Sequence, residues 1–164
     1  MFFRPKAELK KNGRGFSPYG SGSMSEDWSY QVRVNLADEA ARLARKDPKN
    51  PVLQPLSDIL AKHNARLRNQ LDAFSDYVAA AEREGQQDFP LYKWTKAVIE
   101  DPAKIEKHSK AFSIHVGGEE VYAKDIADAL EAEIAPLVGG PLVTRLTKHD
   151  SNPANNPQAP AQYR

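Results

Sequence analysis

The chain of 164 residues contains no cysteine. This absence excludes a disulfide framework, a thiolate nucleophile, and sites built on cysteine ligands, such as cysteine-bound zinc or an iron–sulfur cluster. The sequence also lacks an apolar run near the roughly 20 residues that a helix needs to span a bilayer. Both absences are typical of soluble proteins in a reducing compartment. We therefore predict a cytoplasmic protein, or one within a particle assembled in the cytoplasm, with no membrane contact.

The first residues lack the apolar stretch of a secretory signal peptide. Basic side chains at Arg4 and Lys6 follow Met1, Phe2 and Phe3 almost at once, whereas a signal peptide continues with 7 to 15 apolar residues at about this point. The sequence thus gives no indication of secretion.

The net charge of +1 conceals an uneven distribution. Residues 1–25 hold five basic side chains against Glu8, which gives +4 and leaves −3 for the rest of the chain. A mildly acidic body argues against a globally basic nucleic-acid binder. Contact with a polyanion is therefore expected to come from the N-terminal segment.

Composition divides the chain into three parts. Residues 1–25 are basic, aromatic and interrupted by glycines, and they predict a flexible arm. Residues 26–149 carry the periodic apolar patterns and predict one globular, mostly helical domain, since 124 residues suffice for a hydrophobic core. Residues 150–164, rich in Asn, Pro and Gln, predict a flexible polar tail. Such tails bury too little apolar surface to offset the cost of ordering, so a partner would have to hold them.

Residues 28–36 alternate between apolar and polar side chains, from Trp28 to Leu36. A period of two predicts a half-buried strand. A helix over 26–46 is the alternative, because alanines continue at helical spacing after Leu36. In both interpretations residues 36–45 are helical, and Pro48 and Pro51 end that helix.

Residues 55–85 predict one long amphipathic helix. At 100° per residue, their large apolar side chains fall in one stripe while the charged ones lie outside it. A helix of this length does not stand alone, so its stripe must face other elements or another protein. The members of the stripe are Leu56, Ile59, Leu60, Leu67, Leu71, Phe74, Tyr77, Val78 and Ala81.

Shorter elements are expected after this helix. Residues 91–100 predict a helix, and Asp101 and Pro102 are a typical start for the next one. Two alternating runs around Gly117 and Gly118 predict a β-hairpin with a primed turn. Residues 123–137 predict a helix with Ile126 on its apolar face, and residues 141–146 a short strand. The fold class is therefore α+β and predominantly helical, with one long central helix and a small antiparallel sheet.

Histidines are the first candidates for chemistry. His63 lies in the apolar stripe, where a hydrogen-bonded core histidine and a pH-sensitive contact are both possible. His115 would share a sheet face with Glu120 across the hairpin, as an ordinary cross-strand pair or as the start of an acid–base site. His108 and His149 have no activating neighbour in sequence. Because no nucleophile elbow or phosphate-binding loop occurs, we expect no cofactor, no metal and no catalytic residues, and an unrecognised enzyme is the third-ranked hypothesis.

The N-terminal arm is the main candidate for binding. Its cations would neutralise phosphates while its rings stack on bases, or its rings would anchor in grooves of a neighbouring protein; a solvated tail without function is the third alternative. The residues expected to bind a partner are Phe2, Phe3, Arg4, Lys6, Lys10, Lys11, Arg14, Phe16 and Tyr19, with Tyr163 from the C-terminal tail.

These patterns favour a non-enzymatic structural or accessory subunit of a larger protein assembly, such as a virion component or a small subunit of a multisubunit complex. Its partners would be other subunits, in a homo- or hetero-oligomer, contacted by both termini. Nucleic-acid binding through the arm is the alternative, and loss of binding on Lys10→Ala with Lys11→Ala would identify it.

Overall fold

The computed structural model describes residues 28–163. Its framework is a four-stranded antiparallel sheet of β1 (Tyr30–Leu36), β2 (Ala65–Asn69), β3 (Ala111–Val116) and β4 (Val143–Asp150), in the spatial order β2-β3-β1-β4. Two helices, α3 (Asp38–Lys46) and α4 (Gln54–Lys62), connect β1 to β2, and α8 (Lys124–Ile134) connects β3 to β4. This connectivity is the split β-α-β arrangement of ferredoxin-like folds.

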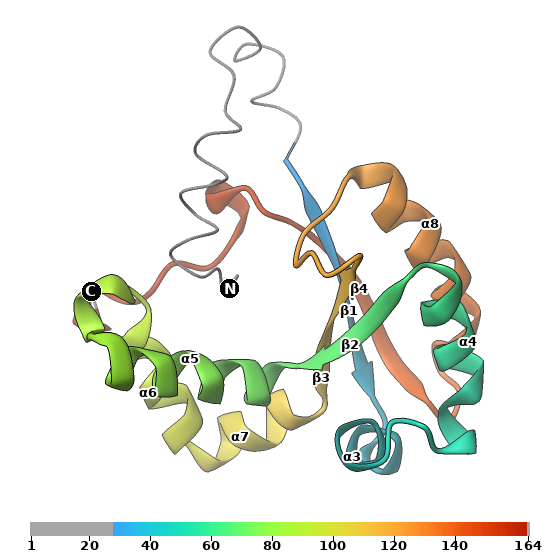
Figure 1. Cartoon of the computed structure of the whole chain (residues 1–164), viewed down its shortest axis with the longest axis horizontal. Coiled ribbons are helices and arrows are strands. Elements are labelled where there is room, and N and C mark those ends of the chain that lie inside the picture. The colour runs from blue at the N-terminus through green and yellow to red at the C-terminus, as the bar shows by residue number, and fades with distance from the viewer. Residues whose placement is uncertain (1–27, 164) are drawn as a thin grey trace, which may run out of the picture.

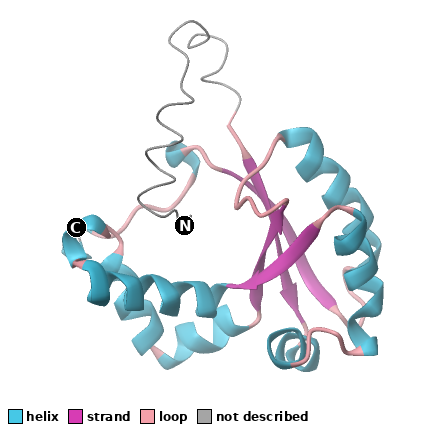
Figure 2. Ribbon diagram, viewed as in Figure 1, coloured by secondary structure: helices cyan, strands magenta, loops and turns pink. Residues whose placement is uncertain are grey.

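A helical insertion separates β2 from β3. It consists of α5 (Gln70–Glu84), α6 (Tyr92–Glu100) and α7 (Pro102–Ser109). In Figure 1, α4 and α8 lie on one side of the strands and α5 to α7 lie on the other. The insertion has an apolar cluster of its own, built from Val78, Ala81 and Tyr92. It therefore forms a lobe beside the sheet, as the helix and strand colours of Figure 2 also show.

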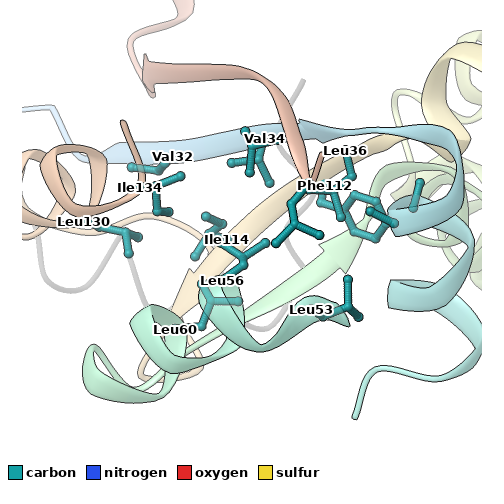
Figure 3. Packing of buried hydrophobic residues seen from close by; sticks show 14 of the residues in the cluster. Val32, Val34, Leu36, Leu53, Leu56, Leu60, Phe112, Ile114, Leu130 and Ile134 are labelled. Carbon is teal, nitrogen blue, oxygen red and sulfur yellow. The ribbon is translucent and has the colours of Figure 1, made fainter. Parts of the chain in front are cut away.

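The main core lies between one face of the sheet and the helices α3, α4 and α8. Alternate residues of β1 and β3 point into it, which is the consequence of the two-residue period of a strand. Figure 3 shows these side chains meeting leucines from α4 and apolar residues of α8. The labelled members are Val32, Val34, Leu36, Leu53, Leu56, Leu60, Phe112, Ile114, Leu130 and Ile134.

The prediction of a single long helix over residues 55–85 is wrong. The structure replaces it with α4, β2 and α5. The break occurs at Asn64, whose φ of 51° is the only positive one for a non-glycine among the described residues. Asparagine adopts this left-handed conformation more readily than other side chains. The chain then reverses and enters β2, where Leu67 pairs with Ile114 of β3.

Other expectations are confirmed. Residues 30–36 form a strand and residues 38–46 a helix. Asp101 caps α7, since its side chain accepts a hydrogen bond of 3.0 Å from the Ala103 N–H. The tight turn at Gly117 and Gly118 is present, with φ values of 60° and 82° that suit glycine. The second strand of the expected hairpin is not, because residues 119–122 form no strand and Val116 and Glu119 make only an isolated bridge. Ile126 departs from its expected inward position, because 38% of it is exposed.

The C-terminal segment continues from a strand longer than expected. Instead of residues 141–146, β4 covers Val143–Asp150. Short 3₁₀ helices follow at Pro153–Asn155 and Ala161–Tyr163. The Asn156 side chain donates to the carbonyls of Asp150 and Asn152 at 2.8 and 2.7 Å. Local hydrogen bonds therefore define the conformation of this segment.

Candidate functional site

The sheet face opposite the core carries the candidate site. Arg68, Ser113, Arg33 and Thr147 form one row across all four strands, since Arg68 pairs with Ser113, Ser113 with Arg33, and Arg33 with Thr147. Side chains that pair directly across a sheet lie on the same face. We call the whole set the arginine face: Gln31, Arg33, Asn35, Arg66, Arg68, Ala111, Ser113, His115, Arg145, Thr147 and His149.

The composition of this face is unusual for a sheet surface. It holds four arginines and two histidines, no aspartate or glutamate, and Ala111 as its sole apolar member. A sheet normally uses its second face either for apolar packing or for a mixture of charges. Guanidinium groups on one face repel one another, and among these four the structure gives a carboxylate partner to Arg68, which pairs with Asp76 of α5 (Gln70–Glu84). The arrangement therefore suits an anionic ligand.

Arg66 and Arg145 occupy the two edges of the arginine face. Arg66 is on the edge strand β2 and Arg145 is on the edge strand β4, and both are exposed. Within residues 28–163, neither side chain forms a hydrogen bond or an ion pair. Neighbouring strands are about 4.8 Å apart, so the two edges are separated by about 14 Å. Both guanidinium groups can meet a ligand that crosses the sheet.

The other two arginines have protein contacts. Arg68 forms an ion pair with Asp76 of α5. Arg33, in the central strand β1, donates from Nε to the Gln31 side-chain oxygen at 2.6 Å. Burial lowers the pKa of Arg33 from its usual value, although the nearby Glu120 opposes this shift. A guanidinium nevertheless stays charged at neutral pH, so the centre of the face remains positive.

The two histidines report the positive potential of this surface. Burial lowers the pKa of His115, and the charges of Arg66 and Arg68 lower it further, against an opposing effect of Glu119. Burial and Arg33 in the same way lower the pKa of His149 to about 4. Both imidazoles are therefore neutral at pH 7, since protonation would add charge next to the arginines.

His115 and Glu120 do not form the expected cross-strand pair. The turn itself is as predicted, because Val116 and Glu119 exchange backbone hydrogen bonds of 3.1 and 3.0 Å. However, His115 pairs with Arg66 of β2, and the Glu120 carbonyl accepts a hydrogen bond from the Gln31 side chain at 2.8 Å. The structure thus places His115 in the arginine face.

His63 lies away from the arginine face. It ends α4, and its Nε2 is 2.6 Å from the Glu133 Oε2 of α8. Lys62 and His63 hold the pKa of Glu133 below its usual value. Asp58, Ile59, Lys62 and Glu133 line an open depression here. The pair links α4 to α8, two of the helices that cover the core.

The remaining candidates are separated. His108 Nδ1 lies 2.9 Å from the Gln70 side-chain oxygen, in the helical lobe. Tyr163 is half-buried in the last 3₁₀ helix. In the part of the chain that the structure describes, no group of three or more His, Asp or Glu side chains could hold a metal ion. The other residues expected to bind a partner lie outside the described residues: Phe2, Phe3, Arg4, Lys6, Lys10, Lys11, Arg14, Phe16 and Tyr19.

Sequence reasoning missed the arginine face for a definable reason. Arg66 and Arg68 alternate with Ala65, Leu67 and Asn69, which is the two-residue period of a strand. The helix predicted over residues 55–85 spans this five-residue pattern, and Leu67 fits its apolar stripe. Arg33 lies at a polar position of the strand that was predicted correctly, so its orientation away from the core followed from the pattern.

No helix within residues 28–163 is long and apolar enough to cross a membrane. Comparison of the chain with protein-family models, with curated proteins and with solved structures finds no match.

Proposed function

We propose that this protein binds nucleic acid through the arginine face. The observation that carries the proposal is the row of Arg68, Ser113, Arg33 and Thr147 across the sheet, with exposed Arg66 and Arg145 at its edges. Guanidinium groups recognise phosphate oxygens with paired N–H donors. A ligand with repeated phosphates would contact the guanidinium groups of Arg66 and Arg145 at the same time.

The charge of the N-terminal arm supports the same ligand class. Residues 1–25 carry +4. A polyanion would attract both these residues and the arginine face. The sequence-based prediction for Lys10 and Lys11 is therefore retained as part of this proposal, with the arm adding affinity to the contacts made by the sheet.

A salt titration tests the proposal. Binding of a fluorescein-labelled 12-nucleotide RNA to the full chain would be measured by anisotropy between 50 and 400 mM NaCl. We expect the logarithm of the affinity to fall linearly with the logarithm of salt concentration, by about 0.7 per phosphate contacted. The double variant Arg66→Gln with Arg145→Gln should bind more weakly and show a slope smaller by about 1.4.

The matched control removes the same charge from the other side of the sheet. Arg42 of α3 and Lys124 of α8 are paired with Glu39 and Asp128 on helices that cover the core. The variant Arg42→Gln with Lys124→Gln should retain the wild-type slope. Equal losses in both double variants, or binding that does not respond to salt, would refute the proposal.

A second candidate function is the accessory subunit that the sequence favours. Four large apolar side chains support it by their exposure: Trp28 at 40%, Val52 at 55%, Ile126 at 38% and Val138 at 41%. Exposed apolar groups are typical anchors for another protein. Sedimentation of the full chain would show self-association that weakens in Ile126→Gln if Ile126 contributes to such a contact.

A further inference from the structure

We propose that two copies of this chain associate through β4, whose outer edge pairs with the same strand of the second copy in antiparallel orientation, centred on Thr147. The two sheets then join into one sheet, with both arginine faces on the same side. The inference rests on the backbone of β4 and on the side chains that such a pairing brings opposite one another. It is therefore independent of the proposed function.

The outer edge of β4 has open backbone groups. Among the described strands, β1 is its one neighbour. The Ser151 N–H donates to the Ser29 carbonyl at 2.8 Å, and every second residue of an antiparallel ladder repeats this arrangement. Thr147 thus turns its N–H and C=O towards β1, whereas Leu146 and Lys148 turn theirs away. Within residues 28–163, no hydrogen bond occupies these four outward groups, which are a template for another strand.

The open stretch is bounded at both ends by contacts within the chain. Before it, the Val143 carbonyl accepts from the Gly139 N–H at 2.9 Å. After it, the Asp150 carbonyl accepts from the Asn156 side chain at 2.8 Å. The stretch between them offers equal numbers of donors and acceptors, so a second copy of the same stretch satisfies all of them.

The side chains are compatible with this pairing. Thr147 lies opposite Thr147 of the second copy, a cross-strand pair that is favourable in sheets. Leu146 lies opposite Lys148, whose charge is balanced by two carboxylates of α8 within its own chain. The methylenes of Lys148 can therefore cover the half-buried Leu146. Arg145 lies opposite His149, which is neutral at pH 7, so no two like charges face each other.

The neighbouring registers are less suitable. A pairing centred on Lys148 would set two ammonium groups directly opposite each other, which is destabilising. A pairing centred on Leu146 would set Lys148 opposite Thr144, where the register of β4 with β1 shifts. It would also leave the open groups of Lys148 without the matching groups of Leu146. The register centred on Thr147 uses all four open groups of each copy.

The opposite edge strand, β2, does not fit its own copy in this way. A symmetric pairing centred on Arg66 or Arg68 opposes each arginine to itself, and one centred on Leu67 opposes Arg66 to Arg68. Like charges directly opposite are destabilising, and charged side chains commonly protect sheet edges from pairing. The two edges of the sheet therefore differ, and β4 is the self-complementary one.

Single-cysteine variants locate the contact, since the chain itself has no cysteine. In the proposed register the two Thr147 Cα atoms are about 4.5 Å apart, as a pair without mutual hydrogen bonds, which a disulfide can span. Thr147→Cys should therefore form a linked dimer on mild oxidation, measured by non-reducing electrophoresis. Arg145→Cys is the matched control on the same strand and face. Its two copies would be about 14 Å apart, so linkage should be at least about 10-fold slower.

Sedimentation equilibrium of the full chain between 5 and 200 μM measures the dimer without a cross-link. Leu146→Pro removes an outward N–H and leaves the ladder with β1 intact, a position at which an edge strand tolerates proline. It should weaken dimerisation by at least about 10-fold. Leu146→Ala also removes the leucine side chain but retains the N–H, so its loss should be much smaller. Far-ultraviolet circular dichroism would verify the fold of each variant.

Three results would overturn the inference: a chain that stays monomeric at 200 μM, equal linkage of the two cysteine variants, or a dimer that Leu146→Pro leaves unchanged. Each leaves the proposed function intact, because RNA binding is measured separately by anisotropy. Conversely, a chain that dimerises through β4 but shows no salt-dependent RNA binding would refute the proposed function alone.

Discussion

The Tyr122 hydroxyl and the Val32 N–H are joined by a hydrogen bond of 2.8 Å between two residues that are 90 positions apart. The same hydroxyl donates to the Ile114 carbonyl at 2.8 Å. It thus connects β1 to β3 just beyond Arg33 and Ser113, where the direct pairing of these strands ends. Burial raises the pKa of Tyr122 to about 12. Tyr122 therefore links the two central strands of the sheet that carries the arginine face.

Tyr122→Phe should destabilise the fold by about 1–3 kcal/mol, because it leaves the buried Val32 N–H without its acceptor and the Ile114 carbonyl without its donor. Urea unfolding of the variant and the wild type measures this cost. Tyr30→Phe is the matched control, since no hydrogen bond of the Tyr30 hydroxyl occurs within residues 28–163. A loss below about 0.5 kcal/mol in Tyr122→Phe would show that water replaces the bridge.

The local sequence pattern is sufficient to predict an element when its apolar residues recur with an unambiguous period, or when the residues that contact one another are close in sequence. The alternation before Leu36 predicted β1, and the Gly117–Gly118 pair predicted the tight turn. It failed between Lys62 and Gln70, because Leu60, Leu67 and Leu71 recur at spacings that a helix would also produce. Pairing of Leu67 with Ile114 is a contact across 47 residues, and no local pattern contains that information.

The candidate site was predictable only in part, for the same reason. The pattern identified Arg33 as a polar position on a strand, but Arg68 joins its row through Ser113 of a third strand. Such a row can be recognised only once the strand order β2-β3-β1-β4 is known. The distribution of charge along the sequence favours the N-terminal arm instead. The arginines of the face are dispersed in sequence, and the part of the chain that contains them has a net negative charge.

The ion pair between Arg68 and Asp76 predicts a gain of affinity. The carboxylate of Asp76 in α5 lies beside the arginine face and forms an ion pair with the Arg68 guanidinium group. This guanidinium group is therefore less available to a phosphate. Asp76→Asn should therefore strengthen RNA binding by about 2- to 5-fold at 100 mM NaCl, the range expected for one exposed ion pair. Fluorescence anisotropy provides the measurement.

Asp58→Asn is the control for this gain. Asp58 lies on α4, on the core side of the sheet, and hydrogen bonds to the Gln54 side chain. It changes the net charge equally without altering the arginine face. An equal gain in both variants would mean that affinity follows overall charge, which would contradict a local role of Arg68.

The histidines predict how stability depends on pH. The pKa values of His149 and His108 are each lowered to about 4, mainly by burial, against about 6.5 in an unfolded chain. Between these values the unfolded chain binds more protons than the folded one. The free energy of unfolding should therefore be highest above pH 6.5 and fall steadily as the pH decreases towards 4.

Urea unfolding at pH 7, 6 and 5 would measure this decline. The variant His149→Phe should show a smaller decline over this interval, because it removes one of the groups that must stay neutral in the fold. Carboxylates with lowered pKa values, such as Glu133, affect the free energy of unfolding mainly at lower pH. The decline between pH 7 and 5 is therefore expected to come from the histidines. An unchanged decline in the variant would show that His149 titrates alike in both states.

Asn69 joins the helical lobe to the sheet, and its removal should loosen that junction. Its side-chain oxygen accepts from the Asp72 N–H at 3.1 Å and caps α5, while its side-chain nitrogen donates to the Ser109 carbonyl at 2.9 Å, at the end of α7. The residue is 5% exposed. Asn69→Ala removes both bonds and should cost about 2–3 kcal/mol by urea unfolding.

Asn69→Asp separates the two contributions. The carboxylate preserves the cap on α5 but places a buried negative charge against the Ser109 carbonyl, so this variant should be at least as unstable as Asn69→Ala. Asn50→Ala provides the comparison with an exposed cap. Within residues 28–163 the Asn50 side chain accepts one backbone hydrogen bond, of 3.0 Å from the Val52 N–H, and its loss should cost about 1 kcal/mol or less. A fully stable Asn69→Asp would mean that the cap alone holds the start of α5, and that α7 is attached to the sheet by other contacts.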